Sequence, residues 1–135
     1  MPLPTHLRTF IIGSSDVSAQ ISTRCHYNAN VPEYSSKPFV WFRTNTDNEE
    51  LTLDGTGGLH EAYVDLECVA NTETAAQATA DAVKARLHGH RGTVGSVTAK
   101  GVFVSDKDDD YLPYMAEANE GAHIVSYTVR MWYTT

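Results

Sequence analysis

The side chains in this 135-residue sequence that could perform chemistry gather in two short segments, and the first contains two histidines. His88 and His90 stand two residues apart in HGHRG (88–92), and imidazole nitrogens are common zinc ligands. A zinc site needs three or four ligands, and no further Cys or His pair has a complementary spacing. A histidine near the end of a helix is also favoured by the helix dipole. We therefore predict no metal site in this segment.

The second segment, DKDDDYLPYMAEANEG (106–121), imitates a calcium-binding loop. Asp106, Asp108 and Asp110 stand at the first, third and fifth positions of such a loop. A calcium-binding loop needs glycine at its sixth position for a sharp turn, and this chain has Tyr111 there. The flanking sequence is typical of strands, whereas an EF-hand loop lies between helices. The segment therefore predicts a solvated acidic loop without bound metal.

Nucleophilic chemistry has little support in the sequence. Cys25 and Cys68 stand in no recognisable nucleophile motif, and no G-x-S-x-G turn occurs. The glycines of GTGG (55–58) lack the lysine and the strand–helix setting of a phosphate-binding loop. Cys68 lies on an apolar strand face, which predicts a small buried thiol in a reducing compartment. We expect no enzyme, and a small metal-dependent enzyme that uses the histidines stays open as an alternative.

Composition and charge narrow the class of protein further. The hydrophobic share is 41% and the charged share 20%, which is ordinary for a globular domain, and the length suits a single domain. Seventeen acidic against ten basic side chains give a formal charge of −7, which argues against a specific grip on nucleic acid. No run of about 18 apolar residues is present, so we expect no membrane span. The N-terminal apolar stretch is too short for a secretory signal.

The elements that would position these residues follow from periodicity. THLRTFIIG (5–13) predicts a short helix, and FVWFRTNT (39–46) predicts a strand that is apolar on both faces. DNEELTLDGTGGLHEA (47–62) carries Asp-Gly and Gly-Gly tips and predicts a long hairpin arm over 45–60. A long helix over 73–88 follows, capped by Asn71 or Thr72, with an inner stripe of small and apolar side chains at Ala76, Ala80, Val83 and Leu87.

Three further segments alternate as strands do, and they complete the predicted fold. These are YVDLECVA (63–70), TVGSVTAKGVFVS (93–105) and AHIVSYTVRMWYTT (122–135). We therefore predict a single α+β domain with an antiparallel or mixed sheet, and with the long helix and the short N-terminal helix packed on one face.

The face of the sheet away from the helices is the main candidate site. Alternation places aromatic and charged side chains there, and Trp, Tyr and Arg are enriched at protein–protein contacts. A monomer rarely exposes such a patch, although a solvated face with partly covered aromatics stays open as the plainer interpretation. We predict a subunit interface formed by Trp41, Arg43, Tyr63, Asp65, Glu67, Arg130 and Trp132.

Three segments, in their order along the chain, resemble the tail-completion proteins of long-tailed bacteriophages, also called tail terminators or tail-to-head joining proteins. TRCHYNANVPEYSSKPFVWFR (23–43) is similar to their opening. VDLECVANTETAAQATADAVKARLHGHRG (64–92) is similar to their alternating strand and alanine-rich helix, and YTVRMWY (127–133) to their closing strand. The resemblance covers nearly the whole chain.

The resemblance implies a structural virion protein of the neck, assembled in the host cytoplasm. It implies a homo-oligomeric ring, typically a hexamer, that caps the tail tube and joins it to the head–tail connector, with DNA passing through the channel. Its partners would then be the tail tube protein and the connector or stopper protein, with no cofactor and no membrane. A head-completion or stopper protein of the same neck stays an alternative.

Carboxylates could face the channel of such a ring, where they would repel phosphates and keep DNA from adhering. The sequence does not decide which ones do. The candidates for the channel, or for contact with the tube or connector, are Asp47, Glu49, Glu50, Asp106, Asp108, Asp109 and Asp110.

Overall fold

The computed structural model describes the backbone of residues 3–27, 38–52, 55–115 and 120–134, and within these ranges it leaves the side chains of 48–52, 55–58, 112–115 and 120–121 undescribed. Along this part of the chain the elements are α1 (Leu3–Ile12), α2 (Ser15–Ile21), β1 (Cys25–Tyr27), β2 (Phe39–Thr52), β3 (Gly55–Ala70), α3 (Glu73–Leu87), β4 (Gly92–Val94), β5 (Val97–Met115) and β6 (Glu120–Thr134). No described helix combines the length and the apolar character needed to cross a membrane.

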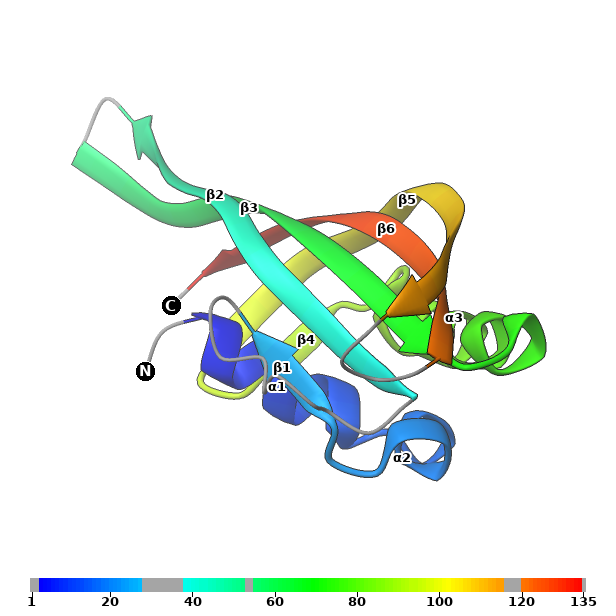
Figure 1. Ribbon diagram of the computed structural model, residues 1–135. Coiled ribbons are helices and arrows are strands. Elements are labelled where there is room, and N and C mark those ends of the chain that lie inside the picture. The colour runs from blue at the N-terminus through cyan, green and yellow to red at the C-terminus, as the bar shows by residue number, and fades with distance from the viewer. Residues whose placement is uncertain (1–2, 28–37, 53–54, 116–119, 135) are drawn as a thin grey trace.

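The six strands form one mixed sheet in the order β1-β2-β3-β6-β5-β4. β1 runs parallel to β2, and every other neighbouring pair is antiparallel. The long strands twist and curl, so that the sheet wraps partly around the helices (Figure 1). The predicted α+β class is therefore confirmed, and the sheet, predicted as antiparallel or mixed, is mixed. Its strong curl was not predicted.

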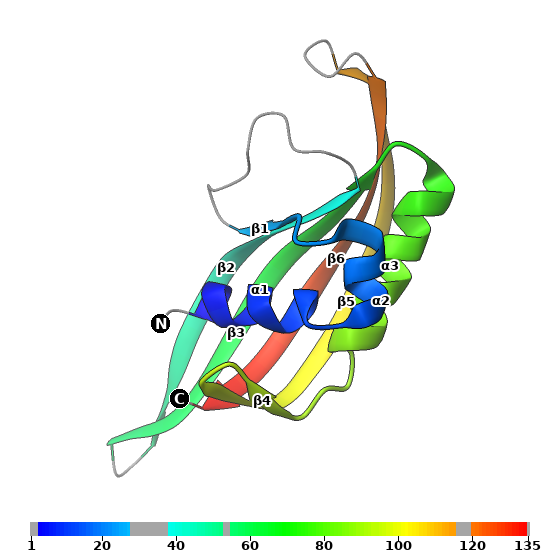
Figure 2. The same cartoon turned by 90° about the horizontal axis from the view of Figure 1, so that it is seen from below.

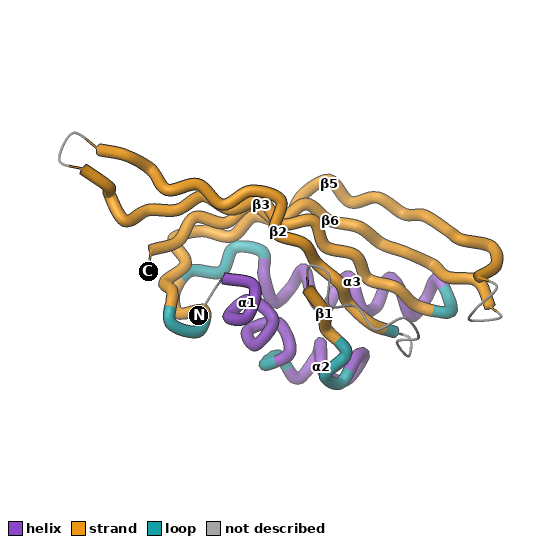
Figure 3. The backbone as a smooth tube through the Cα atoms, turned by 60° about the vertical axis from the view of Figure 1, so that its left-hand side comes forward, coloured by secondary structure: helices purple, strands orange, loops and turns teal. Residues whose placement is uncertain are grey.

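The helices cover one face of the sheet, here called the inner face, and leave the outer face bare. Figure 3 shows all three described helices on the same side of the strands, and Figure 2 views that side directly. The predicted fold class had two helices, whereas the described residues form three. The difference is α2, which begins after Ser14, whose side chain caps the new helix by accepting a hydrogen bond from the Val17 N–H at 3.5 Å.

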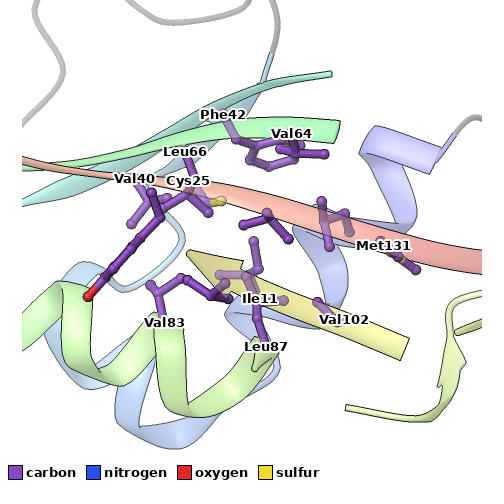
Figure 4. Close-up of a cluster of buried hydrophobic side chains, with 14 of the residues drawn as sticks. Ile11, Cys25, Val40, Phe42, Val64, Leu66, Val83, Leu87, Val102 and Met131 are labelled. Carbon is purple, nitrogen blue, oxygen red and sulfur yellow. The ribbon is translucent and has the colours of Figure 1, made fainter. Parts of the chain in front are cut away.

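The core lies between the inner face and the helices (Figure 4). Phe42 and Leu66 enter it from the sheet, and Ile11, Val83 and Leu87 enter it from the helices, all at 1% exposure or less. Burying each of these side chains stabilises the fold by about 1.5–3 kcal/mol. The alanines of α3 let the helix lie close to the sheet, and Thr72 caps the helix by accepting from the Ala75 N–H at 3.1 Å.

Both cysteines are buried and free. Cys25 on β1 and Cys68 on β3 flank Val40 of β2 in the sheet register. Burial raises the pKa of the Cys25 thiol to about 12 and raises the pKa of the Cys68 thiol as well. Because the thiolate is the reactive form of cysteine, neither side chain is a nucleophile in this fold.

The predicted acidic loop over 106–121 is wrong in its first half. Residues 106–115 belong to β5, which pairs with β6 as far as Met115 opposite Glu120. A run of charged residues in a sequence is typical of a loop. Here the backbone of these residues pairs with β6 through hydrogen bonds, and the side chains still reach water. A β-bulge after Ser105 shifts the register between β5 and β6 and leaves Asp106 at φ 54°. Residues 116–119 lie outside the described part of the chain.

The predicted strand over 93–105 is two strands, because the chain turns between β4 and β5. Gly95 occupies this turn at φ +62°, a conformation that favours glycine. A side chain there would also collide with the ring of His6 on α1, whose Nε2 lies 2.9 Å from the Ser96 hydroxyl. The turn therefore joins β4 and β5 to the N-terminal helix.

The segment predicted as a hairpin arm is the far end of β2 and β3. The two strands remain paired as far as Thr52 opposite Gly55, and they project beyond the rest of the sheet (Figure 1). The arm is thus a continuation of two core strands.

Candidate protein interface

The outer face carries all seven side chains of the predicted subunit interface. In β3 the side chains of Val64, Leu66 and Cys68 point into the core, and those of Tyr63 and Asp65 alternate with them on the other side. The sheet register then brings the set together, since Trp41 lies opposite Glu67, Arg43 opposite Asp65, and Tyr63 opposite Arg130, with Trp132 two residues beyond.

Arg130 is the centre of the aromatic half of this face. Its Nη2 donates to Glu61 Oε2 at 3.1 Å, and its guanidinium lies 4.1 Å from the centre of the Trp132 ring and 5.5 Å from that of Tyr63. Its Nε is buried without a hydrogen-bond partner among the described residues. Arg130 is therefore held in place by one ion pair and two ring faces.

Phe103 extends the aromatic cluster onto β5. Its ring meets the Trp132 ring edge to face at 5.8 Å, and 48% of the residue is exposed. Together with Leu59, Lys100 and Gly101 these rings line an apolar depression of about 570 Å³. The sequence interpretation missed Phe103, although the buried Val102 and Val104 on either side of it give the alternation that would have identified it.

The other half of the outer face is acidic. Asp65, Glu67, Asp106 and Asp108 line a depression of about 470 Å³ together with Trp41 and Arg43. Partial burial raises the pKa of Glu67, the neighbouring Asp65 and Asp110 raise it further, and Arg43 opposes them. The Arg43–Asp65 pair, 3.4 Å long, is exposed and contributes little stability.

The predicted channel carboxylates do not form one group. Asp108 lies opposite Ser126 on the outer face, whereas Asp109 lies on the inner face, where it accepts from the Gln77 amide of α3 at 3.0 Å. Lys107 also bonds to Gln77, at 2.6 Å. Glu49 and Glu50 belong to β2, and their side chains lie outside the described part of the structure.

Asp47 has a contact that the sequence interpretation did not foresee. It accepts a 2.5 Å hydrogen bond from the Tyr133 hydroxyl, and it lies 3.5 Å from Nδ1 of His60, whose ring stacks on Tyr133 at 4.9 Å. Burial and this hydrogen bond raise the pKa of Tyr133. The cluster joins the base of the arm to β6, and only the pairing of three strands brings its members together.

His88 covers an edge of β5, whereas His90 packs on the N-terminal helix. Nδ1 of His88 accepts from the Val104 N–H at 3.0 Å, and the Gly89 N–H donates to the Val102 carbonyl at 2.7 Å. The His90 ring packs on Phe10 at 4.4 Å. Across the described residues, no three His, Cys, Asp or Glu side chains are grouped so that they could hold a metal ion.

This geometry defines a class of protein, an α+β domain with a hydrophobic core and an outer sheet face that no described element covers. That face displays aromatic and charged side chains, as protein interfaces do. A family model described as "Tail completion protein gp17" matches residues 5–134. The chain therefore belongs to the tail completion protein gp17 family, and the resemblance found in the sequence is confirmed. It is a structural protein of a phage-type tail, and not an enzyme.

The fold recurs in a solved structure of a gene transfer agent. A chain from "Virion of native gene transfer agent (GTA) particle" is 13% identical and superposes with a TM-score of 0.65, covering 98% of this chain and 95% of that one. A search of curated protein sequences found no match.

Proposed function

We propose that six copies of this chain form a closed ring that caps the tail tube at the neck and joins it to the head connector, with DNA passing through the ring. Membership in the tail completion family supports the position at the tail end. A closed ring requires contacts in which one patch of a subunit meets a different patch on its neighbour.

The aromatic half of the outer face is the observation that best supports the proposed ring. Phe103, Trp132 and Tyr63 surround Arg130 on a surface that no described element covers. Buried Trp, Tyr and Arg side chains dominate the energies of protein interfaces, and a covering subunit would remove this apolar surface from water.

The negative charge suits the passage of DNA. Each copy carries a formal charge of −7, so a ring lined by carboxylates repels phosphates and lets DNA pass without binding. The candidates to face the channel, the tube or the connector remain Asp47, Glu49, Glu50, Asp106, Asp108, Asp109 and Asp110. Of these, Asp47 and Asp109 are already engaged within the subunit.

Purified chain mixed with tails that lack it provides the test. We expect rings of six copies at one end of the tube by electron microscopy, and cross-links to the tail tube protein. Cross-links confined to the portal adaptor would identify a stopper protein instead. A chain that stays monomeric by light scattering and binds neither tube nor connector would contradict the proposal.

A further inference from the structure

Two large apolar side chains are exposed among those that the structure describes, and both belong to β5. Phe103 is 48% exposed and Tyr111 is 49% exposed. Eight residues of strand separate them, or roughly 26 Å at a rise of about 3.3 Å per residue. They also face opposite ways, because Phe103 lies opposite Arg130 on the outer face and Tyr111 lies opposite His123 on the inner face.

Phe103 belongs to the apolar depression of about 570 Å³, and that depression has a cationic rim. Lys100 is exposed and lines it, and Arg130 stands beside it against Trp132. Gly101 keeps it open, since a Cβ at this position would lie 3.3 Å from the Phe103 ring.

Tyr111 belongs to an acidic surface beside α3, where it lines a depression with Glu73 and Gln77. Figure 2 shows the β5–β6 hairpin reaching past the N-terminal end of α3. The Tyr111 ring packs at a tilt against the His123 ring with centroids 4.5 Å apart, and the same depression is lined by Glu73, Asp109 and Asp110. This surface therefore combines one exposed aromatic side chain with three carboxylates.

The two features are complementary in chemistry and cannot meet within one chain. An aromatic side chain with an acidic surround matches an apolar depression with a cationic rim, and opposite charges guide such surfaces to one register. Because the features lie on opposite faces of the sheet and at separate positions along β5, their contact joins neighbouring copies head to tail, as a closed ring requires.

We propose that the depression formed by Leu59, Lys100, Gly101, Phe103 and Trp132 receives Tyr111 and the acidic surface around it from a second copy of this chain. This inference rests on the proposed ring and names the two surfaces that build it. Tyr111 enters against Phe103 and Trp132, while Asp110 approaches Lys100.

Disulfide trapping in the full chain tests the contact directly. The double variant Lys100→Cys/Asp110→Cys should give a ladder of covalent multimers under mild oxidation, with tail tubes present. The two positions lie ten residues apart on one strand, too far for a disulfide within one copy, and the native Cys25 and Cys68 are buried. The matched control Lys84→Cys/Asp110→Cys moves one thiol to an exposed position on α3 and should give no ladder.

Charge exchange supplies a second measurement. Lys100→Glu and Asp110→Lys should each weaken self-association by about tenfold, and the double variant should recover most of the loss. Lys84→Glu and Asp81→Lys make the same charge changes on exposed positions of α3 and should leave association unchanged.

The outcomes separate this inference from the proposed function. Rings that form without a ladder, and that tolerate both charge changes, would overturn the proposed contact and leave the ring standing. A ladder that links the chain to the tube protein alone would also overturn it. A chain that stays monomeric at high concentration and on tail tubes would overturn both the contact and the ring.

Discussion

The guanidinium of Arg130 lies 4.1 Å from the centre of the Trp132 ring, on the sheet face that the helices leave bare. Arg130 also pairs with Glu61 and reaches Tyr63, so one side chain orders residues from two strands before any partner arrives. A surface ordered in advance loses less entropy on binding. Arg130 therefore orders the aromatic half of the outer face within the monomer.

Replacing Trp132 tests this surface. Trp132→Ala should leave the monomer folded, with a loss of about 1 kcal/mol from its ring contacts. It should weaken assembly by roughly 30-fold, as truncating an aromatic hot spot does. Circular dichroism and light scattering give the two readouts.

Phe10→Ala is the control for Trp132→Ala, because Phe10 is half-buried on the helix side, against Arg86 and His90. It should lower the melting temperature without a specific loss of assembly. If Trp132→Ala removed the helical signal, or left assembly intact, the interface would have to lie elsewhere.

The acidic half of the face should matter for association more than for folding. Charge reversal of both Asp65 and Glu67 to Lys should weaken subunit association strongly while changing the melting temperature little, since the Arg43–Asp65 pair is exposed. Sedimentation and thermal melts measure the two effects. Equal losses in both would place these carboxylates in an intramolecular network instead.

Glu67 gives a pH-dependent prediction. Its pKa in the folded state is raised above the ordinary value of 4.5, so its protonated form stabilises the monomer at low pH, and this contribution is lost as pH rises through the raised pKa. Glu67→Gln should therefore stabilise the monomer at pH 7 and have little effect below about pH 4.

If Glu67 serves assembly, the same substitution should weaken the ring at pH 7. Urea unfolding at the two pH values and light scattering at pH 7 measure the two effects. A variant that is less stable than the wild type at pH 7 would show that Glu67 supports the fold instead.

A substitution of Tyr133 tests the hydrogen bond that joins the base of the arm to β6. Tyr133→Phe removes the hydrogen bond to Asp47 and should destabilise the protein by about 1–3 kcal/mol near neutral pH. Because the folded pKa of Tyr133 is raised above 10.0, its contribution is complete below pH 10 and is lost as pH rises further. The difference between wild type and variant should therefore shrink in alkaline solution.

Urea unfolding at pH 7 and above pH 10 measures this loss, and Tyr63→Phe, which alters a tyrosine of the outer face, is the control. An unchanged difference across this range would mean that the hydroxyl of Tyr133 does not hold the arm.

Local pattern was enough to predict much of this protein. The alternation of Val64, Leu66 and Cys68 with Tyr63 and Asp65 assigned both faces of β3 correctly, because side-chain direction along a strand depends only on the period of two. Spacing likewise predicted the buried stripe of α3, since Ala76, Ala80, Val83 and Leu87 share one side of a 3.6-residue helix.

The tertiary structure alone decided the relationships between segments that lie far apart in the chain. Asp106 to Asp110 are strand residues because β6 pairs with them, and Asp47 meets Tyr133 across 86 residues because β3 lies between their strands. Phe103 meets Trp132 only because β5 pairs with β6. Periodicity is a property of neighbours along the chain, whereas pairing and register depend on which strands the whole fold brings together.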